Sequence, residues 1–307
     1  MNKTYRSNAL RFYLAGVVLV AVGACVCVER CSSKRRQENG EALLKAITLG
    51  NVSRAIELLE AGADPNTRER VSVSDNLAYV GGSLWSRHKL RQISSQATPI
   101  VALIRGGNGI DGASPRHPNL QLLRALLDHG ADPNLRVGAD TPLALSSILP
   151  DDAYCRLLIA HGAKVELKNQ YGTSALMVAC MWHDLQTTQC LIRAGADVNS
   201  LDSDGRTPLA YAVDGSGVGN RNHFDELLDV LLRNGAKINA TDNSGNTLLM
   251  MAVRSAAPDR VSALLRRHPD LKAVNRKGES ALSLASLLEK DKPGKSRIFA
   301  SIIAASK

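Results

Sequence analysis

Glycines recur at an almost constant interval through the second half of this 307-residue chain. Gly162 and Gly195 are 33 residues apart, and His268 stands 33 residues after Gly235, where the next glycine of the series would fall. Each of these four positions is followed ten residues later by a further glycine. A fixed period of this length predicts an array of stacked helical repeats, in which each unit buries its apolar face against its neighbours. Such a unit contains no reaction chemistry, so the pattern predicts a protein that works by presenting a surface.

Each repeat begins with a helix-starting signal. The clearest example is Thr-Pro-Leu-Ala at residues 207–210. The threonine hydroxyl can accept a hydrogen bond from an unpaired backbone N–H of the first helical turn. Proline at the next position loses no helical hydrogen bond, and the leucine and alanine can face the neighbouring helices. Residues in the same register start the other units: Thr98, Thr141, Ser174, Thr247 and Ser280.

The second helix of a repeat ends at a glycine. Residues 62–66 and 130–134 both read Gly-Ala-Asp-Pro-Asn, and residues 195–199 read Gly-Ala-Asp-Val-Asn. Glycine tolerates the left-handed backbone conformation that stops a helix. Aspartate and asparagine then favour a turn that leads into the next unit.

Together these residues closely resemble the ankyrin repeat, over roughly residues 41–305. The resemblance implies an all-α, ankyrin-repeat solenoid of about seven helix-hairpin units with β-turn fingers. One N-terminal apolar helix is expected to precede this solenoid. The expected organisation is a basic segment at 1–11, a transmembrane or signal segment at 12–28, a basic linker at 29–40 and the repeat domain at 41–307. The expected units are 41–66, 67–134 with insertions, 135–167, 168–200, 201–240, 241–273 and 274–305.

The net charge of +9 is concentrated at the two ends of the chain. Residues 1–39 carry +5 and residues 254–307 carry +7, which leaves a slightly acidic middle. A basic end can meet an acidic protein surface, an anionic lipid or a nucleic acid, or it can simply be a solvated helix face. No basic groove interleaved with aromatic residues is present in the sequence, which argues against a nucleic acid partner.

An uncharged run covers residues 12–28, with Lys3, Arg6 and Arg11 before it. Seventeen residues is close to the short limit for spanning a bilayer. The run is therefore predicted to be an uncleaved signal anchor, a lipoprotein signal with lipidation at Cys25, or a cleaved signal peptide. The expected location is the bacterial inner membrane with the repeats on the periplasmic side. The alternatives are a lipoprotein and repeats that face the cytoplasm.

Departures from the period indicate where this chain differs from a generic array. About 24 extra residues precede Thr98, about 11 more lie around 106–118, and 7 lie near 214–222. In ankyrin proteins the fingers line the concave binding face, so the expanded finger at 67–97 is the predicted recognition element. A packed or disordered insertion is the alternative. Aromatic and arginine side chains are common interface anchors, and the candidate partner-binding residues are Tyr79, Trp85, Arg87, His88, Lys89, Arg91 and Trp182. For Trp182, packing in the core or at its rim is the alternative.

Six cysteines fall into two groups. The first group, at 25, 27 and 31, suits membrane-embedded thiols or acylation. Cys155, Cys180 and Cys190 occupy positions of small buried apolar residues. Cys180 and Cys190 stand on the two helices of one unit and can approach each other, and a disulfide there would favour an oxidising compartment.

No catalytic arrangement can be assembled from the sequence. The glycine-rich run at 215–219 resembles a phosphate-binding loop but joins two repeat helices and follows no strand. We therefore expect no enzymatic activity, no metal and no cofactor, with a small-molecule substrate disfavoured. The predicted function is a membrane-tethered scaffold or adaptor that binds another protein. The alternatives are an envelope inhibitor or immunity-type protein that blocks a toxin or enzyme, and, by resemblance to some bacterial ankyrin proteins, an accessory factor for peroxide defence.

Overall fold

The structure is a computed structural model that describes residues 35–68, 98–106, 119–136, 140–149, 151–215, 223–291 and 296–306. Within these ranges the regular secondary structure is helical, and isolated bridges join Thr241 to Thr247 and Val274 to Ser280. No described helix is both long and apolar enough to cross a membrane. The apolar run at 12–28, with Cys25, lies outside the described residues, and so does the expanded finger from 69 to 97.

The helices follow one another as hairpins. The first hairpin joins a helical segment over 35–48 to α2 (Val52–Glu60), so the first helix includes residues that the sequence assigned to a linker. The later hairpins are α4 (Pro99–Gly106) with α5 (Leu120–Asp128), α6 (Pro142–Ser146) with α7 (Ala153–Ala160), α8 (Ala175–Met181) with α9 (Leu185–Arg193), α10 (Pro208–Asp214) with α11 (Phe224–Arg233), α12 (Leu248–Arg254) with α13 (Pro258–Leu265), and α14 (Ala281–Asp291) with α15 (Ser296–Ser306). How many of these hairpins are ankyrin units stays a prediction.

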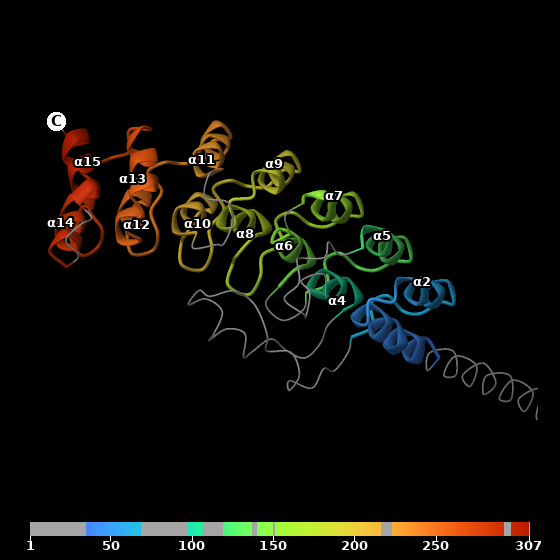
Figure 1. Ribbon diagram of the computed structural model, residues 1–307. Helices are drawn as coiled ribbons and strands as arrows, with labels where there is room; N and C mark the ends of the chain where they lie inside the picture. The colour runs from blue at the N-terminus through green and yellow to red at the C-terminus, as the bar shows by residue number, and fades with distance from the viewer. Residues whose placement is uncertain are drawn as a thin grey trace, which may run out of the picture.

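The hairpins stack side by side in a single curved array (Figure 1). The first helices of the hairpins, α4, α6, α8, α10, α12 and α14, form one row. The second helices form the other row, from α2 through α15. Between the rows runs one continuous hydrophobic core. Five leucines, each four residues before a position of the glycine series, are completely buried in it: Leu126, Leu158, Leu191, Leu231 and Leu264. Complete burial of a leucine contributes about 1.5–3 kcal/mol, so this repeated position is a main source of stability.

The predicted helix caps are present in most units. The hydroxyls of Thr141, Thr207 and Thr247 each accept a hydrogen bond from the backbone N–H three residues later, at 3.1–3.3 Å. Ser174 and Ser280 do the same. The prediction is wrong for Thr98, whose buried hydroxyl has no hydrogen-bond partner in the described part of the chain. Its carbonyl still starts α4 by accepting from Ala102 N at 2.8 Å, so the helix begins as expected without the side-chain cap.

The glycine series ends the second helices in the left-handed conformation, as predicted. Gly162, Gly195 and Gly235 have φ values of 87°, 94° and 90°. His268, at the next position of the series, also adopts a left-handed conformation, with φ of 51°. A side chain with a Cβ is disfavoured there by roughly 1–2 kcal/mol. The turn geometry is therefore kept even where the glycine is not.

The asparagines four residues after Gly62, Gly130 and Gly195 join neighbouring units rather than shaping their own turn. In residues 130–134 the turn is made by Asp132, whose Oδ1 accepts from Asn134 N at 2.8 Å. Asn134 instead donates from Nδ2 to Gly162 O at 3.0 Å and accepts at Oδ1 from Lys164 N at 2.7 Å. Asn66 and Asn199 make the same pair of bonds to the unit that follows each of them. We call this pair of hydrogen bonds the asparagine bridge.

The three described cysteines are free thiols. Cys155 and Cys180 are buried as predicted, and burial raises the pKa of Cys180 to about 12. Cys190 is half-buried. The pairing considered between Cys180 and Cys190 is not formed.

Candidate binding surface along the finger turns

Four finger turns of the same construction precede α8, α10, α12 and α14. We define the finger turns as residues 169–173, 202–206, 242–246 and 275–279. In each, the first residue is aspartate or asparagine. Asp202 is typical, because its Oδ1 accepts from the backbone N–H of Asp204 and of Arg206, both at 2.8 Å. Its own N–H donates to Arg206 O at 3.0 Å, which closes the turn. The other three turns repeat these bonds.

Glycine is required within the fingers for two reasons. Gly172 and Gly205 have φ values of 74° and 77°, a left-handed conformation that disfavours any side chain. In addition, a Cβ on Gly172 would stand 2.9 Å from Ser203 N, and a Cβ on Gly205 would stand 2.9 Å from Asn243 N. The next finger therefore packs directly against the backbone at these glycines.

Successive fingers are also joined by backbone hydrogen bonds. Ser203 N donates to Tyr171 O at 3.0 Å, and Asn243 N donates to Asp204 O at 2.9 Å. Arg276 N donates to Ser244 O at 3.0 Å. The four fingers therefore form one continuous, hydrogen-bonded edge beside the row of first helices.

Two residues at the tip of each finger face outward while the frame beneath them stays constant. We call them the tip pairs: Gln170 with Tyr171, Ser203 with Asp204, Asn243 with Ser244, and Arg276 with Lys277. All eight are exposed except Tyr171, which is half-buried. Their chemistry changes from polar and aromatic, through acidic and neutral, to basic along the edge. A rigid frame with a different exposed pair in every unit is suited to recognition.

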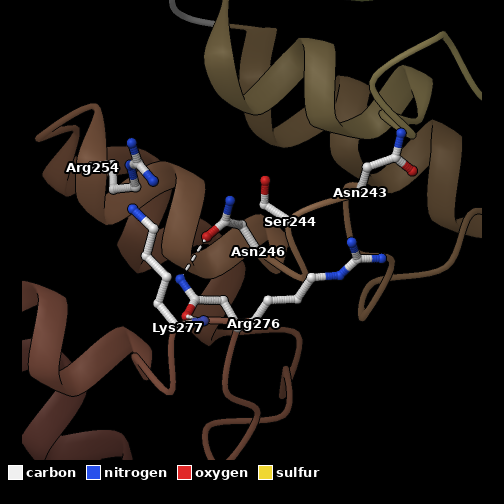
Figure 2. Close-up of a pocket in the computed structure, with 7 residues that line it drawn as sticks. Asn243, Ser244, Asn246, Arg254, Arg276 and Lys277 are labelled. Carbon is white, nitrogen blue, oxygen red and sulfur yellow. Dashed lines mark hydrogen bonds between the residues drawn. The ribbon is translucent and has the colours of Figure 1, made fainter.

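A basic depression of about 310 Å³ lies between the last two fingers. Arg254 lies at the end of α12, whereas Arg276 and Lys277 form the last tip pair, and Asn243, Ser244 and Asn246 lie beside them. Figure 2 shows Arg254 and Lys277 reaching toward the same space, while Arg276 extends along the other side toward Asn243. None of these three cations forms an ion pair with a described side chain.

The sequence candidates fall mostly outside the described residues. Tyr79, Trp85, Arg87, His88, Lys89 and Arg91 lie within the undescribed range 69–97, so their role in partner binding stays a prediction. Trp182 ends α8 on the side away from the fingers and packs, half-buried, against the core. Its buried Nε1 has no hydrogen-bond partner among described atoms. This position fits the packing alternative, and a role in partner binding stays a prediction.

Sequence reasoning missed the basic depression. The excess positive charge of residues 254–307 was visible, but it suggested only a basic end of the chain. Alignment of the units shows more. Arg254 stands seven residues after Thr247, in the register that Asp214 holds after Thr207. A carboxylate in one unit is thus replaced by a guanidinium in the next. This replacement is the feature of the sequence that could have indicated the basic depression.

Comparisons with known proteins identify the repeat. A family model described as "Ankyrin repeats (3 copies)" matches residues 150–222, and a single "Ankyrin repeat" model matches 204–243. The chain is 36% identical over 77 residues to ankyrin repeat domain-containing protein 63 of Homo sapiens, covering 24% of this chain and 20% of the human protein. It is 39% identical over 94 residues to protein PhlB of Serratia liquefaciens, covering 30% of this chain and 41% of that protein.

A third relative is a putative palmitoyltransferase, ZDHHC13, of Danio rerio, with 28% identity over 198 residues that cover 60% of this chain and 29% of the fish protein. The matches span less than half the length of each of these relatives. The repeats within residues 150–243 match ankyrin repeats, a type of repeat that serves as a scaffold for protein–protein interaction. Within the described residues, no group of three metal-ligating side chains could hold a metal ion. The absence of enzymatic activity stays a prediction.

Proposed function

We propose that this chain is a membrane-tethered ankyrin scaffold that captures another protein on the edge formed by its finger turns. The observation that carries the proposal is the contrast between a constant frame and varied tip pairs. Each finger holds its backbone with the same internal bonds, for example those of Asp202 and Asn275, so the tip residues are not needed to form the turn. Exposed side chains on a preordered backbone lose little conformational freedom when a partner binds.

The test compares two double variants of the full chain. Ser203→Arg with Asp204→Arg places two large side chains on one tip pair. Gln186→Arg with Glu60→Arg makes the same change in net charge on exposed positions of the second-helix row. Each variant is used to capture partners from the membrane fraction of the source cells, and affinity for the captured protein is then measured with purified components.

We expect the finger variant to bind the partner at least tenfold more weakly and the second-helix variant to bind as the unchanged chain does. Circular dichroism confirms that both variants keep their helix content. Equal binding by the two variants would show that the fingers are not the binding edge.

The membrane tether is the second part of the proposal, and it rests on the uncharged run at 12–28 with three cations before it. We propose that this segment holds the chain at a bacterial inner membrane with the repeats in the periplasm. Removal of residues 1–28 should move the chain from the membrane fraction to the soluble fraction. Protease added to intact spheroplasts should digest the repeats of the full chain. A full chain protected from the protease would place the repeats on the cytoplasmic side.

A further inference from the structure

The floor of the basic depression is a set of amides whose hydrogen bonds are already made. Asn275 Nδ2 donates to Asn246 Oδ1 at 2.9 Å and to Glu279 Oε2 at 2.8 Å. Asn246 Nδ2 in turn donates to Asp242 Oδ2 at 2.9 Å. The two carboxylates near the depression, Asp242 and Glu279, thus each accept a hydrogen bond from an asparagine amide of the finger turns. Both asparagines are buried, so the floor is fixed before any ligand arrives.

The cations around this floor lack the acidic ion-pair partner that the finger cation of the preceding unit has. In that unit, Arg206 Nη1 lies 3.5 Å from Asp214 Oδ2, so the arginine of the finger has a counter-ion at the end of α10. In the next unit the matching positions are Asn246 and Arg254, and Arg254 forms no ion pair with a described acidic side chain. Arg276 and Lys277 then add two further positive charges from the adjoining finger. Like charges that reach into one space raise the local potential and attract an anion.

The shape and composition of the depression favour a peptide over other anionic partners. Three cations around a hollow of about 310 Å³ offer room for one or two carboxylates, and the exposed amide of Asn243 adds a donor. A flat bilayer surface would not enter a hollow between two turns. A nucleic acid site would be expected to carry aromatic residues for base stacking, and none lines this depression. Arginine in particular forms paired hydrogen bonds with carboxylates.

We propose that this depression, which we name the basic finger pocket (Asn243, Ser244, Asn246, Arg254, Asn275, Arg276 and Lys277), docks an Asp- or Glu-rich segment of the protein partner. The inference rests on the proposed function, because it gives the chemistry of one part of the same binding edge. Carboxylates of the partner occupy the space between Arg254 and Lys277, and Arg276 engages the neighbouring acidic residue. The acidic tip at Asp204 repels the same segment and so sets the direction in which it lies.

The test uses the full chain in neutral detergent and a fluorescent twelve-residue peptide of alternating Glu and Ser. A second peptide has Gln in place of every Glu. The pocket variant is Arg254→Gln, Arg276→Gln and Lys277→Gln. The matched control is Arg193→Gln, Arg233→Gln and Lys237→Gln, which removes the same charge from exposed positions on the second-helix side. Fluorescence anisotropy gives the affinity at about 50 mM and at about 300 mM salt, where exposed charges are increasingly screened.

We expect the Glu peptide to bind the unchanged chain and the control variant alike, and the pocket variant at least tenfold more weakly at low salt. The Gln peptide should not bind measurably. Equal losses in the pocket and control variants would overturn the pocket by showing that only net charge matters. Binding of phosphatidylglycerol vesicles or of single-stranded RNA that depends on the same three cations and exceeds peptide binding would overturn the assignment to a peptide. Capture of the partner by a chain that ignores the Glu peptide would overturn this inference and leave the proposed function standing.

Discussion

Replacement of Asn134 by alanine tests how neighbouring repeats are joined. The side chain makes two hydrogen bonds to the following unit, 3.0 Å to Gly162 O and 2.7 Å to Lys164 N. Alanine removes both without placing a new group at the junction. The position is half-buried, so little apolar contact is lost and the effect reports mainly on the bridge.

The expected loss follows from these two bonds. A hydrogen bond within a protein contributes about 0.5–1.5 kcal/mol net, because in the unfolded chain the same donor and acceptor bond to water instead. Both bonds lie at an exposed edge, where water also reaches the abandoned groups, so values in the lower part of that range apply. Asn134→Ala should therefore lower the free energy of unfolding by about 1–2 kcal/mol.

Hydrogen exchange at the Lys164 amide gives the local measurement. Loss of its acceptor should raise the exchange rate roughly two- to fivefold if the bond contributes about 0.5–1 kcal/mol to the closed state. Asn134→Asp is the matched control, because it keeps the acceptor for Lys164 N and removes the donor to Gly162 O. That variant should keep the Lys164 amide protected while still destabilising the junction. Unchanged exchange at Lys164 in the alanine variant would refute the asparagine bridge.

Three further changes test other parts of the fold. His268→Gly should raise the free energy of unfolding in urea by about 0.5–1 kcal/mol, because relief of the strain at φ of 51° exceeds the extra backbone entropy that glycine loses on folding. A decrease in the free energy of unfolding would contradict this reasoning. Thr207→Ala should lower it by about 1 kcal/mol through loss of the cap to Ala210 N, and an unchanged melting curve would show that the hydroxyl does not cap α10. Burial, which outweighs the hydrogen bond to Ala212 O, lowers the pKa of His183, so stability should be full above pH of about 6.5 and fall as the pH drops below it. In melting curves measured across this pH range, His183→Asn should not show the loss of stability that His183 causes. An equally steep loss of stability in this variant would show that other groups cause it.

The periodic features of the fold could be predicted because each depends on local chemistry. Gly195 stops a helix and Leu191 is buried four residues before it, whichever unit surrounds them. The role of Asn134 could not be read in the same way, because its partners lie 28 and 30 residues away in the next unit. A turn-forming residue and a bridging residue look alike in a sequence.

The basic finger pocket was harder still to predict. Arg254 ends a helix and Arg276 tops a finger in the following unit, so their proximity depends on the stacking of two hairpins. The missing counter-ion becomes visible only when position 254 is aligned with Asp214.

Hydrogen-exchange footprinting of the full chain with and without its captured partner tests the central claim most directly. We predict that the partner slows exchange in the finger turns at 202–206, 242–246 and 275–279, with the largest change in the last two. The second helices α9, α11 and α13 should exchange as they do in the free chain. Protection of those helices with unchanged exchange in the fingers would contradict the claim that the finger edge is the binding surface.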